Sequence, residues 1–216
     1  MASPYFLFLL LLIVIIPLFL LAVLSFLIRP RPTKVPLKGR HVLITGGSSG
    51  IGLALARLSA GAGARVSIVA RGRARLDEAV ESIRLATGVE AAAFSADVRD
   101  YEAVRKAVEE AGPVDVLICN HGVFTPQELE VQELEEVRFM VEVNLMGTFH
   151  LIKAALPAMK RRAKETGLPA SIAIMSSQAG QVGVLATQPT QPVNLLFAAW
   201  GRHCNMRSLP TTFMSL

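Results

Sequence analysis

The sequence has 216 residues, enough for one domain of ordinary size and an appendage, and 52% of them are hydrophobic. Its mean hydropathy of +0.46 is high for a soluble domain, so part of the chain is expected to meet lipid. The net charge is +5, and much of it lies in five basic residues between Arg29 and Arg40, a stretch without an acid. A basic cluster beside an apolar run favours a membrane surface over nucleic acid as the partner.

Residues 5–28 are the first expected element, a membrane-spanning helix. They are apolar except for Ser25 and the tolerated Pro17, and they outnumber the ~20 residues that cross a bilayer core. The alternative, a cleaved signal peptide, needs a basic start and a shorter apolar core. Because the basic cluster follows the span, the positive-inside rule predicts a single-pass anchor with the rest of the chain in the cytosol. Residues 29–39, basic and rich in proline, are then a short stiff linker.

Apolar runs alternate with helical periods across residues 40–184, a pattern typical of a doubly wound parallel sheet of the Rossmann type, in the α/β class. The expected strands are 41–44, 66–70, 91–95, 114–119 and 171–175. The first expected helix starts at Leu53, and the others cover residues 73–86, 101–111, 132–142 and 144–163. Asp100 is the predicted N-cap of the helix at 101–111, and Pro157 is predicted to kink or interrupt the last helix.

The two cysteines, Cys119 and Cys204, form neither a disulfide framework nor a metal-binding spacing. Cys119 lies in an expected strand, which fits a reducing compartment.

Residues 185–216 differ in character from the rest. They contain no acid, no lysine and no tyrosine, and three prolines break any long element. No strand–helix–strand unit continues here, so we expect a C-terminally incomplete sheet whose fifth strand is an edge without a partner. We interpret this segment as a divergent tail joined to a nucleotide-binding domain.

A glycine-rich turn, Thr45-Gly46-Gly47-Ser48-Ser49-Gly50-Ile51-Gly52, joins the first expected strand to the first expected helix. Such a turn lets the backbone approach a diphosphate closely and directs helix N–H groups at its charge. Glycines also serve ordinary turns, but the strand before and the helix after this one favour a dinucleotide site.

Three arginines, Arg71, Arg73 and Arg75, follow the second expected strand, where an acid would bind the 2′-hydroxyl of an adenosine ribose. An arginine at this place accommodates a 2′-phosphate, which predicts NADPH rather than NADH as the cofactor. Arg71 is the main candidate ligand and Arg75 a weaker one. The alternative is that all three are solvated residues at a helix start.

These residues resemble the short-chain dehydrogenase/reductase family. The resemblance covers residues 40 to about 184 through the glycine turn and four further motifs in the family's order. These motifs are Asp97-Val98, Asn120-His121-Gly122, Asn144 and Ser176-Ser177-Gln178-Ala179-Gly180. His121 departs from the family's commoner Asn-Asn-Ala-Gly, a change that a loop read mainly by its backbone tolerates.

The resemblance implies a role for each motif. The glycine turn would line the pyrophosphate, through the five residues Gly46, Ser48, Ser49, Gly50 and Gly52. Asp97 would contact the adenine, and Asn120 and Gly122 would pass beside the adenosine ribose. Ser177 would hydrogen-bond the substrate carbonyl and Asn144 would hold a water in the proton relay. Taken singly, each has an alternative: a helix cap for Asp97, a turn residue for Asn120, an ordinary helical polar group for Asn144 and a strand-end hydroxyl for Ser177.

The proton donor of the family is missing. A tyrosine 13 residues after the catalytic serine and a lysine four residues beyond it are replaced here by Thr190 and Asn194. The tyrosines of the chain are Tyr5 and Tyr101, and no lysine follows Lys164. A threonine hydroxyl is far less acidic than a tyrosine, whose pKa is ~10, so impaired catalysis is expected.

The anchor, the linker and the sequence after residue 176 most resemble family members that reduce 3-ketodihydrosphingosine, a lipid ketone, with NADPH on the cytosolic face of the endoplasmic reticulum. Two alternatives stay open: an inactive anchored protein that binds nucleotide or a partner chain, and an anchored reductase of another lipid or steroid ketone. A homo-oligomer also stays open.

Overall fold

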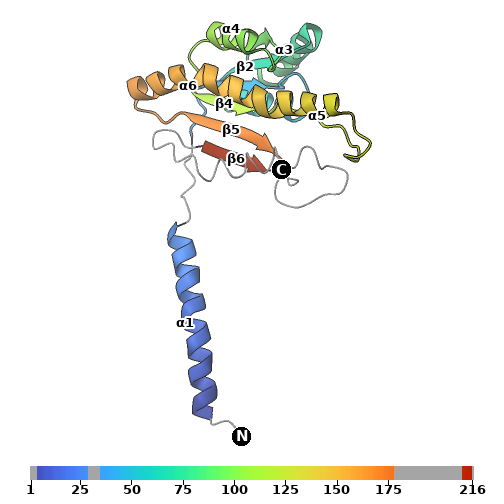
Figure 1. Ribbon diagram of the computed structural model, residues 1–216. Helices are drawn as coiled ribbons and strands as arrows, with labels where there is room; N and C mark the ends of the chain where they lie inside the picture. The colour runs from blue at the N-terminus through green and yellow to red at the C-terminus, as the bar shows by residue number, and fades with distance from the viewer. Residues whose placement is uncertain (1–3, 29–34, 178–210, 216) are drawn as a thin grey trace. The chain divides into compact units, whose positions relative to one another are not determined.

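The computed structural model describes residues 4–28, 35–177 and 211–215, with side chains for residues 13–25 and 35–177. The chain divides into two compact units, Met1–Lys34 and Val35–Leu216 (Figure 1).

The first unit contains helix α1, Pro4–Ile28. Its 25 residues include no charged side chain, and at a rise of 1.5 Å per residue they extend for about 37 Å. The large apolar side chains described in it are exposed, as Phe19 is to 66%. The helix occupies the residues predicted to cross a membrane, and its insertion stays a prediction.

The second unit is built on a parallel sheet in the order β3-β2-β1-β4-β5-β6. Its strands are β1 His41–Thr45, β2 Arg65–Ala70, β3 Ala92–Ser95, β4 Val116–Cys119, β5 Ser171–Ser176 and β6 Thr211–Ser215. The chain runs outward from β1 to β3 and then returns to the other side of β1 as β4. This reversal is the switch point at which doubly wound folds bind ligands, beyond the carboxyl ends of the strands.

Strand β6 corrects one expectation. We expected β5 to be an edge without a partner, but Thr211–Ser215 pairs with it in parallel, from Ile172 opposite Thr211 to Ser176 opposite Ser215. The sequence Thr-Thr-Phe-Met of this strand has the β-branched and aromatic residues that favour strands. The remainder of the expected divergent tail, residues 185–210, lies outside the described residues.

Helices cover both faces of the sheet. On one face α2 Gly50–Gly61 and α3 Arg73–Thr87 pack over a core that includes Ile44, Ile68 and Leu76. On the other face lie α4 Tyr101–Ala111, α5 Leu134–Val141 and α6 Gly147–Thr166, the last drawn across the front of Figure 1. Their core includes Leu117, Leu151 and Ile172. Burial on both faces explains why the strands read as continuous apolar runs.

Residues 134–166 form a nearly continuous helix. A π-helical turn, η1 Glu142–Met146, joins α5 to α6, and Pro157 lies inside α6 without interrupting it. Pro157 is exposed, so its ring and the carbonyl it leaves without a helical partner can meet solvent. Length and composition alone would let Leu134–Thr166 cross a membrane. Because Met140, Leu151 and Met159 of this stretch are fully buried in the domain, we assign it to the core instead.

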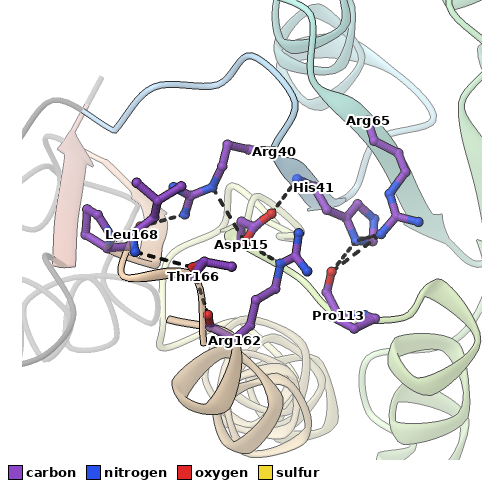
Figure 2. A network of polar contacts seen from close by, with 9 residues as sticks. Arg40, His41, Arg65, Pro113, Asp115, Arg162, Thr166 and Leu168 are labelled. Carbon is purple, nitrogen blue, oxygen red and sulfur yellow. Dashed lines mark hydrogen bonds and ion pairs between the residues drawn. The ribbon is translucent and has the colours of Figure 1, made fainter. Parts of the chain in front are cut away.

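A polar network ties the amino ends of the strands together (Figure 2). The Asp115 carboxylate, 3% exposed, accepts hydrogen bonds from the backbone N–H of His41 at 2.8 Å and from Nε of Arg162 at 2.6 Å. Buried Arg40 forms an ion pair with the same carboxylate at 3.5 Å and donates to the carbonyl of Pro169. Burial by itself would raise the pKa of Asp115, but these hydrogen bonds and the two arginine charges hold that pKa below its usual value. The network lies at the edge of the sheet opposite the carboxyl ends.

Candidate functional site

The glycine turn leaves the carboxyl end of β1 and enters α2 through two residues with positive φ, Gly46 at 64° and Gly50 at 52°. Side chains rarely adopt this backbone conformation, which explains glycine at both positions. Gly52 is required for another reason: a Cβ there would lie 2.6 Å from Nδ2 of Asn120 and would also overlap the carbonyl of Gly46. The turn therefore packs directly against the loop that follows β4.

A pocket of about 660 Å³ opens at the switch point, a volume within the usual range for a small-molecule site. Nine of the predicted cofactor-binding residues line it: Gly46, Ser48, Ser49, Gly50, Arg71, Arg75, Asp97, Asn120 and Gly122. The tenth, Gly52, lies directly behind the turn. Six further lining residues belong to none of the quoted motifs: Val69, Ala70, Gly72, Ala96, Val123 and Val143. Apolar strand ends carry no motif, so pattern alone could not find most of these.

The three arginines after β2 separate into two kinds. Arg71 and Arg75 line the pocket. Arg73 forms an ion pair with Asp77 at 3.0 Å on the exposed surface of α3 and is not among the described lining residues. The two arginines that the sequence named as candidate phosphate ligands are therefore the two that line the pocket.

Asp97 also lines the pocket, after β3, the strand that neighbours β2 in the sheet. Its Oδ2 accepts from Nη2 of Arg99 at 2.7 Å, and its Oδ1 accepts from Nε of Arg99 at 3.2 Å and from the Arg99 backbone N–H at 3.0 Å. The hydrogen bonds from Arg99 hold the pKa of Asp97 below its usual value, and the charge of Arg71 adds to the effect. The alternative reading as a helix cap is wrong. Asp100 caps α4, as predicted, by accepting from the N–H groups of Glu102 and Ala103.

The loop after β4 is fixed at two residues, His121 and Val123, on either side of Gly122. His121 lies between Thr45 and Thr148, with Nδ1 at 2.8 Å and Nε2 at 3.3 Å from their hydroxyl oxygens. Burial lowers the pKa of this ring to about 4, so it is neutral near pH 7. Val123 is held by Asn144, whose side chain accepts from the Val123 N–H at 2.8 Å and donates to its carbonyl at 2.9 Å.

Asn144 lies in η1, and its two amide atoms both serve this clamp. Its backbone carbonyl accepts from the Thr148 hydroxyl at 2.9 Å. Asn144 therefore shapes the pocket wall, and a water-holding role in a proton relay stays a prediction.

Ser177 follows β5, at the carboxyl edge of the sheet, and is exposed. It is not among the residues that line the pocket in the described part of the chain. Thr190 and Asn194, which occupy the positions of the family's tyrosine and lysine, lie outside the described residues, as does Cys204. Cys119 is buried in β4, and burial raises the pKa of its thiol to about 12, so it is not a reactive thiolate.

Comparisons with known proteins agree with this geometry. Residues 40–189 match the short chain dehydrogenase family. The 3-dehydrosphinganine reductase TSC10B of Arabidopsis thaliana is 60% identical over 180 residues, which cover 83% of this chain and 53% of the relative. The Arabidopsis 3-dehydrosphinganine reductase TSC10A is 64% identical over 153 residues, covering 71% of this chain and 46% of the relative. The chain thus spans about half the length of these two relatives.

Among solved structures, L-sorbose reductase from Gluconobacter frateurii, in complex with NADPH and L-sorbose, is similar with a TM-score of 0.71 and 26% identity. The similarity covers 79% of this chain and 65% of that one. The chain belongs to the short-chain dehydrogenase family.

Proposed function

We propose that the pocket at the carboxyl edge binds NADPH. The carrying observation is the combination of a backbone cradle that a Cβ would fill, at Gly46 and Gly52, with Arg71 and Arg75 at the end of β2. The cradle and the first turn of α2 suit a pyrophosphate, and a guanidinium at the end of β2 suits a 2′-phosphate. The NADPH complex of the sorbose reductase supports the choice of a nicotinamide cofactor.

Within this arrangement each remaining motif has a proposed role. Asp97 contacts the adenine, with its carboxylate orientation fixed by Arg99. Asn120 and Gly122 pass beside the adenosine ribose, and Asn144 keeps their loop in place through Val123. Ser177 donates a hydrogen bond to the substrate carbonyl and stabilises charge on its oxygen.

We propose 3-ketodihydrosphingosine as the substrate of the reductase to which this sequence corresponds, because the two Arabidopsis relatives are 3-dehydrosphinganine reductases. Bound NADPH would supply a hydride to the C3 carbonyl of that lipid. The apolar, uncharged α1 would anchor the chain in the endoplasmic reticulum membrane and keep it beside a membrane-dissolved ketone. Residues 29–39 would then be the linker, and the nucleotide-binding domain would face the cytosol.

A second candidate is an anchored protein that binds NADPH without turning it over. The observation that favours it is the replacement of the family's tyrosine and lysine by Thr190 and Asn194. A threonine hydroxyl cannot act as the general acid near neutral pH, and asparagine has no charge to lower the pKa of a neighbouring donor. The two candidates share the cofactor site and differ in hydride transfer.

The proposed cofactor is tested by titrating the full chain in detergent with NADPH and NADH and following nicotinamide fluorescence. We expect one saturable site with NADPH bound at least about tenfold more tightly, a difference of ~1.4 kcal/mol. Superimposable curves for the two dinucleotides would refute the assignment of the 2′-phosphate site.

A further inference from the structure

We propose that His121 is a positioning residue whose neutral ring sets the spacing between the two walls of the dinucleotide pocket. The inference rests on the proposed NADPH site. One wall is the glycine turn after β1, and the other is the loop after β4. Thr45 is the last residue of β1 and directly precedes Gly46, so a bond between His121 and Thr45 joins the walls at their base.

Hydrogen-bond accounting at Thr45 assigns the protons of the ring. A threonine hydroxyl has one proton and two lone pairs. The backbone N–H groups of Asn120 and His121 donate to Thr45 Oγ1 at 3.0 Å and 3.3 Å and occupy both lone pairs. The hydroxyl proton is then directed at Nδ1 of His121, 2.8 Å away, in preference to the Ile118 carbonyl at 3.4 Å.

The other ring nitrogen must therefore be Nε2–H. It faces Oγ1 of Thr148 at 3.3 Å, and the proton of that hydroxyl is donated to the carbonyl of Asn144 at 2.9 Å. The ring also hydrogen-bonds the backbone of Val143, which a ring N–H satisfies. A second proton on the ring would point from Nδ1 at a hydroxyl oxygen that already accepts two hydrogen bonds. The geometry thus favours the neutral ring, in agreement with the low pKa of His121.

The surroundings are shaped for a ring of this size. A Cβ on Gly147 would lie 3.2 Å from Nε2 of His121 and 2.7 Å from Cγ2 of Val98. On the other side, a Cβ on Gly46 would lie 3.2 Å from Nδ2 of Asn120 and 3.3 Å from Cα of His121. The two walls touch, so a change in the position of His121 changes the width of the cradle.

The first test is direct observation of the ring by ¹⁵N-detected NMR of the cofactor-free full chain in detergent. His121→Gln identifies its signals among the four histidines. We expect the Nε2–H tautomer with no protonation between pH 7.5 and pH 5.5. An imidazolium at pH 6, or the Nδ1–H tautomer, would overturn the proposal.

The second test measures NADPH affinity for three variants. His121→Leu keeps the apolar volume but loses both hydrogen bonds, and we expect affinity to fall about tenfold, the equivalent of one lost buried hydrogen bond. His121→Asn keeps an acceptor for the Thr45 hydroxyl and should recover most of the loss. Thr148→Val removes one partner of Nε2 and the bond to Asn144. It should weaken NADPH binding severalfold, and it takes the place of the leucine variant in this test if that variant does not fold.

The matched control is His150→Leu on the same helix as Thr148. Nδ1 of its ring donates a hydrogen bond to the Val98 carbonyl, 2.9 Å away, and the ring packs at a tilt against Tyr101. His150 is not among the described lining residues of the pocket. We expect less than about a twofold change for this variant. If the His121→Leu variant and the unmutated chain bind NADPH with equal affinity, the positioning role of His121 is refuted and the proposed NADPH site is not. Absence of NADPH binding by the unmutated chain would refute the proposed function and, with it, this inference.

Discussion

Arg71, Arg73 and Arg75 alternate along a stretch of five residues, yet Arg71 and Arg75 line the pocket and Arg73 does not. The first of the three directly follows β2, where the strand direction points it toward the switch point, while Arg73 is paired with Asp77 on the outside of α3. A sequence can place an arginine after a strand, but it cannot say on which side of the following helix each guanidinium falls.

Arg71→Asp should abolish or reverse the NADPH preference, because a carboxylate repels a 2′-phosphate and can accept from a 2′-hydroxyl. We expect at least about a tenfold loss of NADPH affinity, or ~1.4 kcal/mol, with NADH binding unchanged or improved. Paired titrations with the two dinucleotides measure it. Arg73→Asp carries the same charge change outside the pocket and serves as the control. If both variants lose NADPH equally, the net charge of the region, and not a defined phosphate ligand, is responsible.

The residue scale also shows what sequence reasoning missed. The motif residues that line the pocket were identified because they occur together and in the family's order, although each of them taken singly has an ordinary alternative. His121 was recognised only as a departure from the family pattern, because its role depends on Thr45 and Thr148, which are 76 and 27 residues away in the chain. No local pattern records such a contact.

At the scale of the elements, the five predicted strands begin and end within two residues of the observed bounds of β1 to β5. A strand that is buried on both faces is a continuous apolar run, so its ends are visible in the sequence. The exceptions have physical reasons. Pro157 does not interrupt α6 because it faces solvent, and the helical stretch departs from α-helical geometry at η1 instead, where Asn144 bonds outward to Val123. The pairing of β6 with β5 was missed because it joins segments separated by the residues that gave no sheet pattern.

The amino-end network makes a prediction about stability. Asp115→Asn should lower the free energy of unfolding by about 3–5 kcal/mol, because it leaves Arg40 and Arg162 without their counter-charge in a buried site. Urea unfolding of the full chain in detergent measures it. Asp77→Asn, in an exposed pair with Arg73, is the control and should cost under about 1 kcal/mol.

The same network predicts in which direction the free energy of unfolding changes with pH. The pKa of Asp115 is lower in the folded chain than its usual value of 3.8, so its contribution is complete above that pH and is lost as pH falls through the folded value. Burial is the main reason that the pKa of His41 lies below its usual value of 6.5 in the folded chain. Below pH 6.5 the unfolded chain therefore takes up a proton at His41 more readily than the folded chain, which lowers the free energy of unfolding. Unfolding curves should therefore show stability falling as pH is lowered from about 6.5 toward 3. A smaller acid-dependent loss is expected for Asp115→Asn, and an unchanged slope would contradict this account of the carboxylate.

For the whole molecule, the fold class followed from the alternation of strands and helices, and the family from five motifs in order. The proposal that the chain is anchored in a membrane rests on α1 and on the basic residues after it. Protease treatment of sealed microsomes that contain the chain with a C-terminal tag should digest the region beyond residue 40, since positive residues remain on the cytosolic side. Detergent-permeabilised microsomes supply the control for cleavage. Protection of the tag in sealed microsomes, together with its loss after permeabilisation, would reverse the topology.

The central claim is that the chain retains the cofactor site of its family but lacks the proton donor that completes the reaction. NADPH oxidation with 3-ketodihydrosphingosine, followed at 340 nm beside the complete Arabidopsis reductase TSC10A under equal conditions, tests it most directly. We expect saturable NADPH binding with turnover reduced by at least about a thousandfold, a barrier increase of ~4 kcal/mol. Turnover within about tenfold of the relative, a barrier difference of only ~1.4 kcal/mol, would contradict the claim. Another group would then be supplying the proton that the family's tyrosine donates.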